Sequence, residues 1–277
     1  MDKKYEDLPV EVPHPTDPAH KLKLVRTTEA FVCDGCNEPG DGPRYTSADD
    51  ADCGSRNSSI RLHTSCALAG AATPLQHHLF PGMAFVFLPK PPPPVDETVC
   101  DACGEPARGF VYHCYEGGTK GGLDVHPCCW SLQPTITTHG EPKPLELCNS
   151  KASRHCALCG KKGRRKRFWA YCCYDANDDR HVYLHVACVI EAARRAWDED
   201  YHERVGGGGG IVRASMPAIE AAVQKSLARN ARSSRGGFAR VMKIVTTVAQ
   251  IVIAAIFGNP LGMISALVGP GGFFLQG

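Results

Sequence analysis

Cysteine and histidine recur in the same order three times along this chain of 277 residues. Each time, a Cys-x-x-Cys pair is followed after 22 to 26 residues by a His-x-x-Cys pair. Three thiolates and one imidazole fill all four positions around a tetrahedral zinc ion, which is the donor set of a closed structural site. The predicted sites are Cys33, Cys36, His63 and Cys66; Cys100, Cys103, His126 and Cys129; and Cys156, Cys159, His185 and Cys188.

The spacing of the repeats predicts three small units rather than one large domain, because the first cysteines lie 67 and 56 residues apart. Units of this size bury little apolar surface and often depend on a metal for stability. Alternating runs such as 109–112 predict short strands, and the apolar spacing in 189–204 predicts a helix. We therefore expect tandem zinc-stabilised α+β modules, each a twisted β-ribbon with a short C-terminal helix, followed by a helical hydrophobic tail.

Composition divides the chain further. The proline run 91–94 reads as a stiff spacer between modules one and two. The predicted segments are module one at 14–76, module two at 77–135, module three at 139–205, a glycine linker at 206–210, a basic amphipathic helix at 211–237 and the hydrophobic tail at 238–277.

The thiols are expected to be reduced. The charged N-terminus lacks the apolar core of a secretory signal, and the odd count of 15 cysteines fits poorly with a fully paired disulfide framework. This favours metal over disulfides and a cytoplasmic protein. Six of the Cys and His side chains outside the twelve donors are interpreted as surface or packing residues: His14, His113, Cys128, Cys148, His155 and Cys172.

A histidine also precedes each Cys-x-x-Cys pair, as His20 does 12 residues before Cys33. Typical phrases are Cys-Asp-Ala-Cys-Gly at 100–104, Gly-Phe-Val-Tyr-His-Cys at 109–114 and Tyr-Leu-His-Val-Ala-Cys at 183–188. Over residues 14–190 this order resembles the phorbol-ester/diacylglycerol-type zinc finger of the protein-kinase-C type. It is most similar to the divergent, Cys/His-rich form repeated in plant proteins.

The resemblance implies a second zinc in each module, held by the leading His, a second Cys pair and a trailing Cys. The sequence departs from that pattern in every module, with Ser47, Gly117 and Ala176 at expected Cys positions. The twelve core donors predict three zinc ions, and the second sites that the resemblance implies raise the maximum to six. The remaining second-site candidates are His20, Cys53, His78 (with His77 as its alternative), Cys114, His139, Cys173 and His181.

Charge is distributed unevenly. Residues 206–277 hold seven basic side chains and one acidic one, a net +6, which leaves −4 for the Cys/His-rich part. Beyond Lys243 no side chain is charged, and the apolar runs 244–257 and 261–268 approach the length of about 20 residues that a bilayer span needs. One reading is a tail anchor with the modules on the cytoplasmic side. The other is a helical hairpin that docks on a partner or self-associates.

These features favour a non-catalytic scaffold that binds protein partners in intracellular signalling, because four protein ligands leave zinc no position for a substrate. The alternatives are a ubiquitin ligase, a chromatin reader or a diacylglycerol sensor. The acidic segment 49–52 argues against lipid, and the missing Cys before each metal-site His argues against a ring finger. The basic run 161–167 could serve as a nuclear address, but the acidic surroundings argue against nucleic acid as the partner.

Overall fold

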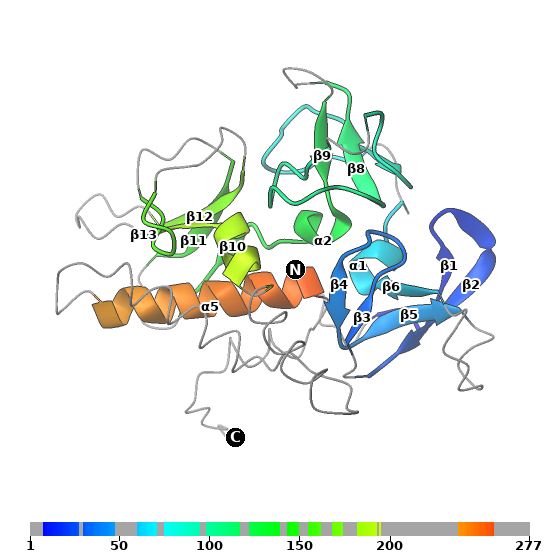
Figure 1. Ribbon diagram of the computed structural model, residues 1–277, viewed down its shortest axis with the longest axis horizontal. Helices are drawn as coiled ribbons and strands as arrows, with labels where there is room; N and C mark the ends of the chain where they lie inside the picture. Colours follow the sequence, from blue (N-terminus) through cyan, green and yellow to red (C-terminus); the bar gives the residue numbers. More distant parts are fainter. Residues whose placement is uncertain are drawn as a thin grey trace, which may run out of the picture.

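The computed structural model describes residues 8–27, 30–47, 60–70, 75–94, 98–116, 122–138, 143–149, 155–161, 168–173, 182–192, 194 and 238–257. Within these ranges, small antiparallel sheets and short helices form three lobes arranged along one long helix (Figure 1). The predicted glycine linker 206–210 and amphipathic helix 211–237 lie outside the described residues.

Module one is built on a four-stranded antiparallel sheet in the order β1-β2-β5-β6. Its last strand ends at His63, and the helix that follows begins at the next residue. A separate hairpin, β3-β4, carries the first Cys pair in its connection. The elements are β1 (Glu11–His14), β2 (Asp17–Val25), β3 (Ala30–Val32), β4 (Pro39–Asp41), β5 (Arg44–Ser47), β6 (Arg61–His63) and α1 (Thr64–Ala67).

Module two has a three-stranded sheet in the order β7-β8-β9, followed by a short helix. The elements are β7 (Val86–Leu88), β8 (Val111–Cys114), β9 (Leu123–Val125) and α2 (Pro127–Trp130). Strand β7 precedes the proline run 91–94 and pairs with β8, which follows it. The prolines therefore lie inside module two, and their interpretation as a spacer between modules one and two is wrong.

Module three repeats the four-stranded antiparallel arrangement in the order β10-β11-β12-β13. The elements are β10 (Thr135–Ile136), β11 (Leu145–Cys148), β12 (Ala170–Cys173) and β13 (Val182–His185). The chain is helical from 186 to 192, which is earlier than the predicted helix 189–204 begins. The helix begins immediately after His185, just as α1 begins immediately after His63.

The modules contact one another through a backbone hydrogen bond that recurs at equivalent positions. The Phe110 N–H of module two donates to the Gly35 carbonyl of module one at 2.8 Å. The Trp169 N–H of module three donates to the Ala102 carbonyl of module two at 3.1 Å. Gly35 and Ala102 each immediately precede the second cysteine of a Cys-x-x-Cys pair, and the two donors lead into β8 and β12. The cysteine turns of modules one and two thus each dock on the strand entry of the next module.

An ion-pair cluster also joins the three modules. Arg194, a helical residue of module three, pairs with Glu38 of module one and with Glu105 of module two, the latter at 3.3 Å. Both glutamates lie five residues after the first cysteine of their module. One guanidinium of module three thus contacts the same position after the Cys pair in modules one and two.

A buried aromatic cluster fills the space where modules two and three meet. The His77 ring stacks on Trp169 with centroids 4.8 Å apart and meets Trp130 edge-on at 4.7 Å. Burial, together with the neighbouring His78, lowers the pKa of His77 to about 4. His77 is therefore a neutral packing residue near pH 7.

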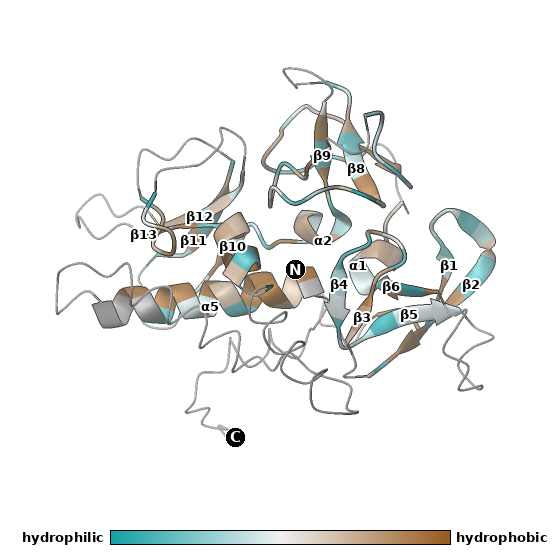
Figure 2. Cartoon of the chain, in the orientation of Figure 1, coloured by the Kyte–Doolittle hydropathy of each residue, from teal (hydrophilic) through white to brown (hydrophobic). Residues whose placement is uncertain are grey.

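The long helix α5 (Phe238–Phe257) forms the first part of the predicted hydrophobic tail. It contacts α2, β4 and β13, and so touches all three modules (Figure 1). Its apolar residues (Figure 2) are buried in the same core as the modules, including Ile244, Val248, Ile251 and Val252. Among the described residues, no helix has the length and apolarity needed to cross a membrane. The second apolar run, 261–268, lies outside the described residues.

Candidate metal centres

A tight turn presents the first two cysteines of each site. In every turn the N–H four residues after the first Cys donates to its carbonyl at 2.8 Å, as in Asn37 to Cys33. That fourth residue has a positive φ in all three turns: 61° at Asn37, 77° at Gly104 and 65° at Gly160. Glycine and asparagine tolerate this left-handed conformation best, which explains their placement directly after each Cys pair.

A strand end and a helix start present the other two donors. His63, His126 and His185 each stand at the end or immediately after the end of a strand, and a helix begins at the next residue. One helical turn takes 3.6 residues, so a Cys three positions after the His returns to the same side. This explains the His-x-x-Cys spacing in all three modules.

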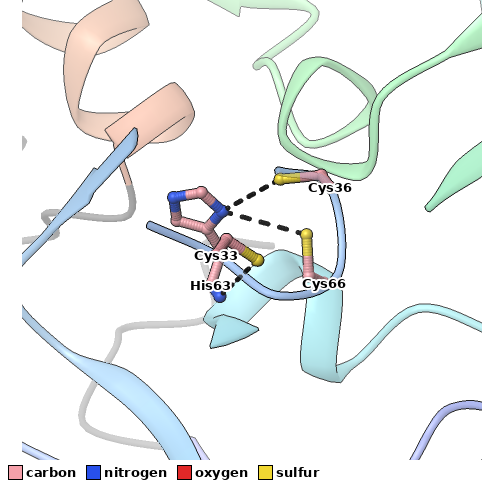
Figure 3. A group of neighbouring side chains, drawn as sticks. All are labelled: Cys33, Cys36, His63 and Cys66. Atoms are coloured by element: carbon pink, nitrogen blue, oxygen red, sulfur yellow. Dashed lines mark hydrogen bonds between the residues drawn. The ribbon is translucent and has the colours of Figure 1, made fainter. Parts of the chain in front are cut away.

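The structure brings the twelve predicted donors together in three groups of four. Within each group, all the ligand atoms lie within 4.8 Å of one another. In the first site, the Nδ1 atom of His63 lies 3.3 Å from Cys36 Sγ and 3.9 Å from Cys66 Sγ (Figure 3). The corresponding Cys103–His126 and Cys159–His185 distances are both 3.6 Å. Nδ1 is thus the imidazole atom directed at each centre.

The donor chemistry fits zinc. Three thiolates and one imidazole nitrogen form a common tetrahedral zinc set. In the first two sites the other imidazole nitrogen, Nε2, donates to a backbone carbonyl, from His63 to Pro39 at 3.0 Å and from His126 to Pro106 at 3.3 Å. Such a bond fixes the tautomer that leaves Nδ1 free to bind a metal. These centres are compatible with three zinc ions.

The electrostatics of the first two sites favour an ionised thiol. Burial opposes ionisation of Cys33, but hydrogen bonds from Cys36 and Cys66 hold its pKa well below the usual value of a thiol. At Cys100, burial also acts against ionisation, and hydrogen bonds from Cys103 and Cys129 again hold the pKa well below that value. The thiolate is the form that binds metal, so both sites are prepared for a cation.

The third site is built less completely. His185 Nε2 is buried without a hydrogen-bond partner, and Cys159 and Cys188 are partly exposed, whereas every donor of the other two sites is buried. Removing the outer partner of a ligating histidine typically weakens metal affinity by about 10- to 100-fold.

We therefore predict that the third site releases its zinc first, at a chelator concentration about tenfold or more below that needed for the other two. Native mass spectrometry during a chelator titration counts the zincs, and alkylation of the released thiols identifies the site. Early alkylation of Cys159 and Cys188 is expected. If Cys33 or Cys100 were alkylated first, the ranking would be wrong.

The second-site candidates are not gathered into a further donor group within the described residues. His20 is exposed on β2, 3.3 Å from Asp17, and His78 is exposed beside the aromatic cluster. Cys114 and Cys173 are buried at the ends of β8 and β12, and the Cys114 thiol donates to the Glu116 carbonyl at 3.1 Å. Cys53, His139 and His181 lie outside the described residues, so a second zinc in any module stays a prediction.

Cys128 lies next to the first metal centre, a position that the sequence analysis did not predict. Its side chain is 2 % exposed, and its Sγ lies 3.1 Å from Ser65 Oγ on helix α1 of module one. It also interacts with the side chains of Cys36, Cys66 and His63 of the first site. The only available signal was the pair of consecutive cysteines at 128 and 129, one of which the repeat pattern left unassigned.

Cys148 and Cys172 form a close thiol pair on the sheet of module three. They stand on neighbouring strands, β11 and β12, and the Cys172 thiol donates to the Cys148 sulfur with an Sγ–Sγ distance of 2.8 Å. A disulfide needs about 2.05 Å between the sulfurs, so a small movement would allow a bond.

Mild oxidation should therefore join Cys148 to Cys172. One equivalent of hydrogen peroxide oxidises the two thiols to a disulfide and is itself reduced to two water molecules. Peptide mapping of the zinc-loaded protein should find this cross-link before any other, and Cys148→Ser should abolish it. A first cross-link elsewhere would contradict the prediction.

Comparison of the chain with models of protein families, with curated proteins and with solved structures finds no match.

Proposed function

We propose that this chain is a non-catalytic zinc-binding protein whose three modules form a scaffold for protein partners in intracellular signalling. The observation that carries the proposal is the composition of the three centres, each with four protein donors within 4.8 Å. A zinc ion held by four protein ligands has no open position at which to activate water or polarise a substrate. The metal then supports the fold.

The contacts between modules support a scaffold of fixed geometry rather than three modules that move independently. The cysteine turns of modules one and two dock on the next module, and Arg194 joins glutamates of both. Helix α5 packs against elements of all three modules. Surfaces on different modules would then keep fixed positions relative to one another, and a partner could contact two modules at once.

The state of the cysteines supports an intracellular location. The fourteen cysteines within the described residues are all free thiols, and all of them except Cys148 are either predicted zinc donors or buried. Reduced thiols of this density persist in reducing compartments. On this basis we propose a cytoplasmic location.

A test of the absence of catalysis uses the zinc-loaded full chain. Peptide, ester and phosphoester substrates should show no turnover that depends on zinc. Zinc-dependent hydrolysis that disappears when a carboxylate outside the twelve donors is replaced would contradict the non-catalytic assignment.

A test of the scaffold role begins with chemical cross-linking of the zinc-loaded chain in cell extract, followed by identification of the captured proteins. A captured protein supports the proposal only if the purified pair binds with a micromolar or tighter Kd and its cross-links map to the modules. Excess chelator should release it, while the same chelator saturated with zinc should not. If no captured protein binds again in purified form, the scaffold role is refuted.

A further inference from the structure

Helix α2 of module two brings a fifth sulfur to the first metal centre. Helices α1 and α2 contact each other, and the ribbon of module two runs beside the site (Figure 3). Cys128 lies on α2, is 2 % exposed, and approaches the site within 3.1 Å of Ser65 Oγ. Ser65 directly precedes the donor Cys66, so this contact places the Cys128 sulfur against helix α1, which carries that donor.

The direction of the two consecutive thiols on α2 explains how one helix serves two sites. Neighbouring residues on an α-helix point about 100° apart. Cys129 faces Cys100, Cys103 and His126 of its own module. Cys128 faces the other way and interacts with Cys36, Cys66 and His63 of module one. The two sulfurs therefore lie at different metal centres.

The first centre thus has a further thiol next to its four donors. Cys33, Cys36, His63 and Cys66 form the donor group, and Cys128, outside that group, interacts with Cys36 and Cys66 and has the same chemistry as three of the donors. Zinc in structural sites is almost always four-coordinate, and a full set of four thiolates is as common a solution as three thiolates and an imidazole.

We propose that Cys128 is an exchangeable ligand of the first zinc, so that the ion is held by Cys33, Cys36 and Cys66 together with either His63 or Cys128. In the exchange, the bond from zinc to His63 Nδ1 breaks and a bond from zinc to Cys128 Sγ forms. The proton of the Cys128 thiol passes to the freed imidazole nitrogen. In the second form, the zinc ion itself links module one to module two.

The test removes the imidazole and asks whether zinc stays. We use the full chain and count bound zincs by native mass spectrometry relative to the unchanged protein. His63→Ala should lose no zinc, because Cys128 completes the site. The matched variant His126→Ala, at the second site, should lose one. Cys128→Ala alone should lose none, and His63→Ala combined with Cys128→Ala should lose one.

Substitution of cobalt for zinc gives a second readout that does not depend on stoichiometry. Absorption from thiolate to cobalt grows with the number of bound thiolates. His63→Ala should therefore show stronger thiolate absorption than the unchanged protein, and the double variant should show weaker absorption than His63→Ala.

Two results would overturn the proposal. One is loss of a zinc from His63→Ala equal to the loss from His126→Ala. The other is retention of all zincs by the double variant, which would show that Cys128 is not the replacement donor. The proposal rests on the zinc sites and not on the scaffold role. Failure to bind any zinc in the unchanged protein would refute the sites themselves, whereas the variants report on Cys128 alone.

Discussion

Removing zinc from the loaded protein with a strong chelator should abolish the cooperative unfolding of its modules. Each module has a small sheet, one short helix and a metal centre buried at their junction. Structural zinc sites contribute apparent binding free energies of about 10–16 kcal/mol near neutral pH. A typical domain is stable by only about 5–15 kcal/mol, so loss of the metal removes an amount comparable to the whole.

Far-UV circular dichroism during thermal unfolding measures this effect. The zinc-loaded protein should show a sigmoidal transition, and the chelated protein should lose it and regain it when zinc is added back. Chelator saturated with zinc beforehand serves as the control and should leave the transition unchanged. A zinc-free protein that unfolds at the original Tm would contradict the structural role of the metal.

Replacing Gly109 by alanine should have the largest effect of any single methyl group at the contact between modules one and two. A Cβ at this position would lie 2.0 Å from the Gly35 carbonyl oxygen, which already accepts the Phe110 hydrogen bond. The new Cβ is fixed to the backbone of residue 109 and the oxygen is a backbone atom of Gly35. Neither can rotate away, so the backbones of the two modules must move apart. Overpacking of a rigid contact typically costs 1–3 kcal/mol and occasionally more, and we expect a loss of about 3 kcal/mol or more in the free energy of unfolding.

Urea unfolding of the zinc-loaded variants measures this loss. Gly82→Ala is the matched control, because a Cβ there meets no atom within 4 Å and the only expected cost is its positive φ of 81°, about 1–2 kcal/mol. The zinc count of both variants is measured beside the unfolding, because Gly35, which the new Cβ of Gly109→Ala would meet, lies inside the Cys33–Cys36 turn. If Gly109→Ala lost no more stability than Gly82→Ala, the close backbone approach would not hold in solution.

The grouping of the twelve Cys and His side chains could be predicted from sequence because its geometry is local. A Cys-x-x-Cys turn and a His-x-x-Cys helix start each place two donors by backbone geometry alone. The only long-range prediction in each module is which turn meets which helix start. The short strands around Tyr112 and Tyr171 follow from the same kind of local alternation. The proline run at 91–94 was harder, because a strand pairing from Val86 to His113 decides its place and no local signal reports it.

The contacts between modules were beyond sequence reasoning for a different reason. Gly35 meets Phe110, and Cys128 meets the first site, only because two modules adopt one particular relative orientation. The apolar pattern of α5 predicts that one surface of the helix is buried, but it does not identify what buries it. Lipid, a partner protein and the chain's own modules would each bury Ile244 and Val248, and in the structure the modules do so.

The backbone hydrogen bond between neighbouring modules always runs in one direction. The later module donates an N–H from the start of its strand, and the cysteine turn of the earlier module accepts it. Module two donates from its strand entry to module one and accepts at its cysteine turn from module three, so the three modules follow one another in a fixed direction. Gene duplication could add another module through the same backbone contact. Damage to the middle module would break two of these contacts, whereas damage to an end module would break one.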